Sequence, residues 1–81
     1  MPKNLSKEEE QYLMKFGTNL RRLRDESGMT QADLVFEAGV HGNTVGRIER
    51  GERAANILQL EKIAKALDVK VEELFEFGGQ K

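Results

Sequence analysis

The sequence predicts an all-α fold, a single domain over residues 1–81 in which five helices surround one small core. The only proline is Pro2, so no proline interrupts a helix inside the domain. Runs of β-branched residues that mark strands are missing. Apolar residues instead recur three and four positions apart, behind residues that cap helices. A chain of 81 residues is expected to form one small core, and without cysteine that core must be stabilised by packing.

The first helix is expected over residues 7–26. Ser6 and Glu9 have the spacing of a capping box, in which each side chain bonds the backbone N–H of the other residue. Gly28 suits the left-handed position that ends a helix. The apolar face of this helix consists of Leu13, Phe16, Leu20 and Leu23.

Two short helices are then expected over residues 31–38 and 41–50, joined by a tight turn. Thr30 and Asp33 form a second capping box at the start of this pair. Gly39 supplies the positive φ of the turn at little steric cost. The inward positions of the pair are Leu34, Ala38, Val45 and Ile48, with Gly51 ending the second helix.

The last two helices are expected over residues 57–67 and 71–76. Asn56 is the predicted N-cap of the longer one. The short final helix is expected to bury Leu74 and Phe75. The predicted core stripe of the longer helix is Ile57, Leu60, Ile63, Ala64 and Leu67.

Charge and composition exclude several classes of function. The formal net charge is −1, with acidic clusters near both ends and arginines between them, so a basic surface must come from folding. The single histidine, His41, has no evident nucleophile or metal cluster, so we expect no enzyme, metal or cofactor. No apolar run could span a bilayer, and the first ten residues lack the core of a signal peptide, so we expect a cytoplasmic protein with no membrane partner.

Most of the chain resembles the Xre/Cro/lambda-repressor type of helix-turn-helix. The resemblance covers residues 16–75 and rests on LRRLRDESGMTQADL, AGV, TVGRIERGER, LQLEKIAKAL and ELF. It implies a compact five-helix lambda-repressor-like domain that binds double-stranded operator DNA as a homodimer and regulates transcription in the bacterial nucleoid. Small members of the family include phage-type repressors, restriction–modification controller proteins and antitoxins. The length resembles the first two, for which no small-molecule ligand is expected.

The resemblance assigns DNA contacts to individual positions. Its base-reading positions include Asn43, which can pair with adenine, and Arg47, which can pair with guanine. A solvated surface side chain is the simpler alternative for each. His41 and Thr44 would reach a phosphate or a thymine methyl group. Phosphate contacts are implied for Thr30, Gln31, Arg50 and Arg53, although Thr30 can serve only as a cap and the arginines only as mobile surface charges.

The resemblance also implies a salt bridge between Arg24 and Glu49, which would tie the first helix to the third. Arg24 lies about 20° round from Leu13 on a helical wheel, so it borders the buried face. We expect this pair to orient the third helix.

Three residues depart from the family pattern. Val35 stands where alanine is usual, at a close crossing of two helices. Gly42 occupies a base-contact position, and Gly46 lies inside the third helix, where glycine costs about 1 kcal/mol relative to alanine. We therefore expect Asn43 and Arg47 to make most of the direct base contacts, with DNA shape contributing.

A dimer interface is predicted from apolar residues that fall outside the core stripes, namely Leu58, Phe75 and Phe77. Scattered surface hydrophobic residues are the simpler alternative. A different function also remains open, because the same fold can serve as a protein-interaction module, such as an antitoxin that binds its partner. The near-neutral charge and the two glycines favour that alternative slightly.

Overall fold

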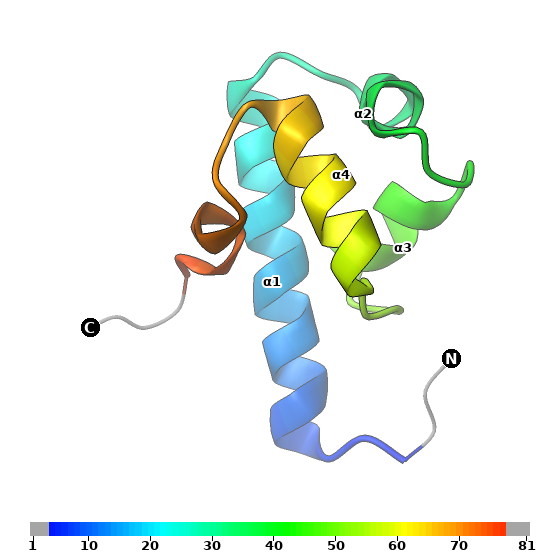
Figure 1. Ribbon diagram of the computed structural model, residues 1–81. Helices are drawn as coiled ribbons and strands as arrows, with labels where there is room; N and C mark the ends of the chain where they lie inside the picture. Colours follow the sequence, from blue (N-terminus) through cyan, green and yellow to red (C-terminus); the bar gives the residue numbers. More distant parts are fainter. Residues whose placement is uncertain (1–3, 78–81) are drawn as a thin grey trace.

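The computed structural model describes residues 4–77, which form four α-helices and a closing 3-10 helix (Figure 1). The predicted all-α fold is confirmed, and no strand occurs in this part of the chain. The helices are α1 (Lys7–Glu26), α2 (Gln31–Ala38), α3 (Thr44–Glu49), α4 (Ile57–Leu67) and the 3-10 helix η1 (Val71–Phe75).

The long helix α1 is the spine on which the other elements pack. Figure 1 shows α2 and α3 on one side of α1 and η1 on the other, with α4 crossing between them. The predicted capping box starts α1: Ser6 Oγ accepts from the Glu9 N–H at 3.1 Å, and the Ser6 N–H donates to Glu9 Oε1 at 2.9 Å. At the other end Gly28 has φ +73°, a left-handed conformation that suits glycine.

The core lies where α1, α2, α3, α4 and η1 meet. One residue from each of four elements has no exposed surface: Leu20, Leu34, Val45 and Leu74. Full burial of such a side chain contributes about 1.5–3 kcal/mol, and the core as a whole holds the elements in one arrangement. Its other buried apolar members are Phe16, Leu23, Ala38, Ile48, Ile63, Ala64 and Leu67.

The third helix is shorter than the sequence predicted. It begins at Thr44 rather than at His41, and its N-cap Asn43 has φ −102° and ψ 9°. Residues 41–43 form a turn in which the His41 carbonyl accepts the Thr44 N–H at 3.0 Å. Gly42 explains the difference, because a glycine in the first turn of so short a helix favours the turn.

Two predictions for buried residues were wrong. Ile57, assigned to the core stripe of α4, is 81% exposed. It is the first residue of α4 and lies one turn before Leu60, where the packed part of the helix begins. Phe75 is 40% exposed. The last element is a 3-10 helix with three residues per turn, so Phe75 points about 120° away from the buried Leu74.

Candidate nucleic-acid interface

Helices α2 and α3 and the turn between them form a helix-turn-helix unit. Thr30 Oγ1 accepts from the Asp33 N–H at 3.0 Å, and the Thr30 N–H donates to Asp33 Oδ2 at 2.9 Å, which confirms the second capping box. Gly39 follows α2 with φ 68° and ψ 37°, as the turn requires. Local features of the sequence therefore define where α2 begins and where the turn follows it.

The surface that begins at the turn before α3 carries most of the residues predicted to contact DNA. His41 and Asn43 are exposed in the turn, and the Asn43 side chain makes no capping hydrogen bond. Arg47 is partly exposed one turn further along, with 34% of its side chain accessible. Arg50 and Arg53 are exposed in the chain that follows. Exposed polar and cationic side chains thus follow one another from the turn before α3 to the chain after it. We call this set the α3 edge: His41, Asn43, Arg47, Arg50 and Arg53.

Thr44 does not belong to this surface. It is completely buried, because it lies four residues before Ile48 and shares that residue's inward face. Its hydroxyl has no hydrogen-bond partner within residues 4–77. A base contact from Thr44, as the sequence suggested, is therefore excluded in this conformation.

Gln31 and Gly46 join α2 to α3. The Gln31 side-chain amide donates to Glu49 Oε1 at 2.9 Å. A Cβ atom at Gly46 would lie 3.2 Å from both Gln31 Oε1 and Arg50 Nη1, so glycine makes room for these two side chains. Gly46 therefore faces the neighbouring helix, whereas Gly42 faces open space, with nothing within 4 Å of a Cβ there.

Glu52 lies among the exposed arginines. Its carboxylate accepts from Arg50 Nε at 2.9 Å and from Arg50 Nη2 at 3.2 Å, and it lies 4.0 Å from Arg47 Nε. The hydrogen bond from Arg50 is the main cause of a lowered pKa for Glu52, and the same bond raises the pKa of Arg50. One carboxylate thus offsets part of the positive charge on this edge.

A buried ion pair connects α1 to α3. Arg24 Nε donates to Glu49 Oε2 at 2.6 Å and Arg24 Nη2 donates to Oε1 at 3.0 Å, which is bidentate geometry. Arg24 Nη1 also donates to the Met29 carbonyl at 2.8 Å. Only 9% of the Arg24 side chain and 3% of the Glu49 side chain are exposed. The hydrogen bond to Glu49 is the main cause of a raised pKa for Arg24.

Gly17 is a residue that sequence reasoning missed. It lies where α1 and α3 cross, and a Cβ atom there would collide with the backbone carbonyls of Ile48 and Glu49. Only glycine allows the two helices to approach this closely. A glycine inside a long predicted helix, next to the apolar Phe16, was the available signal.

The three residues predicted for a dimer interface have different environments. Leu58 is 69% exposed near the start of α4, and Phe75 is 40% exposed on η1. Phe77 was expected to lie outside the core, but it is half-buried and packs against it. Its ring centroid lies 5.3 Å from that of Tyr12 and 6.2 Å from that of Phe16. Leu58 and Phe75 are thus the more accessible members of the set.

Other kinds of site were also considered. Within residues 4–77, no three or more acidic or histidine side chains are grouped so that they could hold a metal ion. The same residues contain no helix of the length and apolar character that crossing a membrane requires.

Comparison with known proteins identifies the family. Residues 20–74 match the helix-turn-helix family HTH_3. The chain is 40% identical over 63 residues to the control protein C.BamHI of Bacillus amyloliquefaciens. These aligned residues cover 76% of this chain and 78% of that protein. It resembles the restriction-modification controller protein C.AhdI of Aeromonas hydrophila at 43% identity and a TM-score of 0.76, over 78% of this chain and 96% of that one. The controller protein C.Esp1396I is similar at 35% identity and a TM-score of 0.72, over 80% and 86% of the two chains.

These relatives are named as control proteins, and others are named as transcriptional regulators. Their names favour regulation over catalysis. The match covers the capped helix α2, the turn at Gly39 and the exposed edge of α3, which are the features that the geometry singled out. The chain therefore belongs to the HTH_3 family of helix-turn-helix transcriptional regulators.

Proposed function

We propose that this protein is a homodimeric regulator that binds a pseudo-palindromic operator, with the α3 edge of each protomer in a major groove. The observation that carries the proposal is the exposure of Asn43 and Arg47 on that edge, beside Arg50 and Arg53. A dimer is needed because one such domain contacts too little DNA for high specificity. Since an operator lies on the chromosome or on phage DNA, nucleoid association is part of the proposal.

The contacts follow from the chemistry of the side chains. Arg47 can donate two hydrogen bonds to guanine O6 and N7, and Asn43 can pair with adenine N6 and N7. His41 lies beside them and can reach a base or a phosphate. Thr30 and Gln31 at the start of α2, with Arg50 and Arg53, are the proposed phosphate contacts. Gln31 would make its contact through atoms that its bond to Glu49 leaves available.

Glu52→Gln is expected to strengthen binding to DNA. The substitution releases Arg50 and Arg47 from a carboxylate and removes one negative charge from the proposed interface. The slope of log affinity against log salt concentration should become more negative by about the amount expected for one additional phosphate contact. Fluorescence anisotropy at several salt concentrations measures both quantities.

Replacing Glu52 is a cleaner test of its effect on DNA binding than lowering the pH. The pKa of Glu52 is lowered, so its ion pair persists at neutral pH and is lost only as the pH falls through that lowered pKa. Glu61→Gln is the control for net charge, because it also removes one negative charge, from an exposed residue on α4. Equal effects of the two substitutions would contradict a local role for Glu52.

An apolar surface supports the dimer. Two grooves with volumes of about 450 and 140 Å³ share Tyr12, Leu13 and Ala54, and Phe75 lines the smaller one. Ile57 and Leu58 at the start of α4 add large exposed side chains, 81% and 69% accessible. Apolar grooves and exposed large apolar side chains of this kind are typical of an interaction site.

Leu58→Glu is expected to shift the protein towards monomer in sedimentation experiments, because a carboxylate cannot be buried in an apolar interface without a partner. Phe36→Ser on α2 is the matched control, since Phe36 is also exposed but lies outside this surface. Sedimentation of the wild type only as a monomer at tens of micromolar would contradict the dimer.

The names of the relatives suggest a narrower role. C.BamHI is a control protein and C.AhdI a restriction-modification controller, and we propose the same role for this chain. Control would depend on protein concentration and on cooperative occupation of operator sites, and the operator's position would decide between activation and repression. A reporter gene placed behind the operator that the protein binds should respond steeply to protein concentration. A shallow response, or none, would argue against a controller.

A second candidate function is a protein-interaction module. One observation favours it: Phe36 is 82% exposed on α2, and the acidic Asp33 and Glu37 lie three residues before it and one after. In that case the wild type should fail to shift DNA in a gel even at low salt.

A further inference from the structure

We propose that Asn19 is a positioning residue that fixes η1, and with it the dimer surface, relative to the reading helix α3. The proposal rests on the proposed dimer and adds the residue that sets its geometry. Asn19 is 4% exposed and lies in the middle of α1, two residues from the α3 crossing at Gly17.

The Asn19 amide links α1 to η1 through hydrogen bonds. Its Nδ2 donates to the carbonyl of Leu74 at 2.9 Å and to that of Glu73 at 3.1 Å. These carbonyls belong to the last turn of η1, where the Glu73 carbonyl also accepts the Glu76 N–H at 3.3 Å. Both amide hydrogens are thus used to hold η1 on α1.

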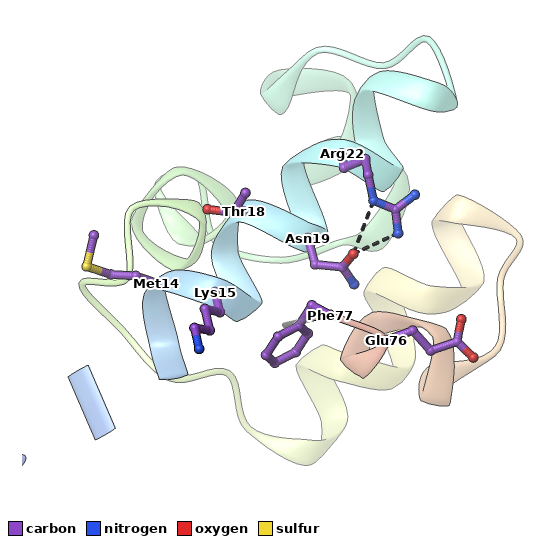
Figure 2. Close-up of a pocket in the computed structure, with 7 residues that line it drawn as sticks. All are labelled: Met14, Lys15, Thr18, Asn19, Arg22, Glu76 and Phe77. Carbon is purple, nitrogen blue, oxygen red and sulfur yellow. Dashed lines mark hydrogen bonds between the residues drawn. The ribbon is translucent and has the colours of Figure 1, made fainter. Parts of the chain in front are cut away.

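Arg22 determines which way the Asn19 amide points. Asn19 Oδ1 accepts from Arg22 Nη2 at 2.7 Å and from Arg22 Nε at 3.3 Å (Figure 2). Arg22 Nη1 in turn donates to Glu26 Oε2 at 2.9 Å. With its oxygen held by a cation, the amide must direct its nitrogen toward η1. A flipped amide would bring its oxygen against two carbonyl oxygens.

The hydrogen bonds of Asn19 bear on how the dimer surface lies relative to the reading helix α3. Phe75, on the element that Asn19 holds, packs on Phe16 with ring centroids 5.1 Å apart, and it lines one of the apolar grooves. On the same stretch of α1, Gly17 lies against α3. Residues 16–19 therefore connect the dimer surface to the reading helix. A change in the Asn19 clamp would alter dimerisation and half-site spacing while leaving α3 in place.

Asn19→Asp tests the clamp with almost no change in shape. The carboxylate keeps the bond to Arg22 but has no hydrogen to donate to the two carbonyls. The dimer dissociation constant should rise about tenfold, because the buried Leu74 carbonyl loses its donor and η1 is held less firmly on α1. Amide hydrogen exchange should accelerate in residues 71–77 but not in α2 and α3. Binding to an isolated half-site should stay at the wild-type level, and binding to the full operator should weaken.

Two further variants sharpen the experiment. Arg22→Met should weaken dimerisation in the same direction but by less, since the amide keeps its donors and loses only its orienting partner. Thr18→Ala is the control, because Thr18 lines a groove together with Asn19 and Arg22 and takes no part in the clamp (Figure 2).

The outcomes separate the possible failures. If Asn19→Asp lowered the unfolding temperature while the dimer dissociation constant stayed unchanged, Asn19 would be a structural residue only and the positioning role would be wrong. Unchanged exchange in residues 71–77 would overturn the clamp itself. If the wild type were a monomer, the proposed dimer would fail first, whereas the exchange experiment would still report on the clamp.

Discussion

Arg24→Ala is expected to lower the free energy of unfolding by roughly 3–5 kcal/mol, which is the range for removing one partner of a buried ion pair. The Glu49 carboxylate would stay buried with Gln31 as its remaining side-chain donor, and the Met29 carbonyl would lose its bond to Arg24. DNA binding should weaken as well, because Glu49 is the last residue of α3 and the pair holds that helix on α1. Chemical denaturation and anisotropy measure the two effects.

The matched control is Arg21→Ala. Arg21 pairs with Asp25 at 3.8 Å, but 69% of its side chain is exposed, so the expected loss is about 0–1 kcal/mol. Arg24→Met combined with Glu49→Leu should recover most of the stability, because both charges are then removed together. An unchanged thermal midpoint in Arg24→Ala would show that the pair does not hold α3.

Gly17→Ala is expected to destabilise the protein by about 1–3 kcal/mol or more, the range for overpacking a tight contact. The new Cβ would meet the backbone of residues 48–49, including the Glu49 carbonyl carbon at 2.7 Å, and backbone cannot rotate away as a side chain can. Alanine is the better helix former by about 1 kcal/mol, so helix propensity alone predicts the opposite sign. Thermal unfolding decides between the two effects.

Gly46→Ala is the control for this substitution. Its new Cβ would approach only the tips of Gln31 and Arg50, at 3.2 Å, and both are flexible side chains. The gain in helix propensity should then dominate, giving a change between zero and about 1 kcal/mol of stabilisation. If both glycine substitutions were equally well tolerated, the close α1–α3 crossing would not be needed for stability.

The features that depend on neighbouring residues could be predicted from the sequence. Ser6, Thr30 and Asn56 cap their helices as expected, because a cap needs only a side chain and an N–H three residues later. Gly39 and Gly51 adopt positive φ where turns were expected. Local chemistry therefore placed the helix-turn-helix unit before any tertiary contact was known.

The features that depend on tertiary packing could not be predicted in the same way. Thr44 was assigned to DNA from the family resemblance, but it lies four residues before Ile48 and shares the buried face of α3. Ile57 has the spacing of the core stripe, yet no element within residues 4–77 covers the first residue of α4. Spacing gives the face of a helix but not where along its length that face is covered.

Two residues that position the site gave a signal that was overlooked. Gly17 and Asn19 lie among the apolar residues of α1, which is an unusual place for a glycine and an amide. Their partners lie on α3 and η1, far along the chain. The glycine marks a close approach of two helix backbones, and the amide marks a hydrogen bond to the backbone of another element.

Selection of bound DNA from a random pool, carried out in parallel with wild type, Arg47→Ala and Arg21→Ala, tests the central claim most directly. The wild type should enrich two inverted half-sites centred about 34 Å apart, one helical turn. Arg47→Ala should lose preference at one guanine position in each half-site, a cost of about 1–3 kcal/mol, whereas Arg21→Ala should select the wild-type site. Enrichment of no common sequence by the wild type, or of the same sequence by Arg47→Ala, would contradict DNA reading through α3.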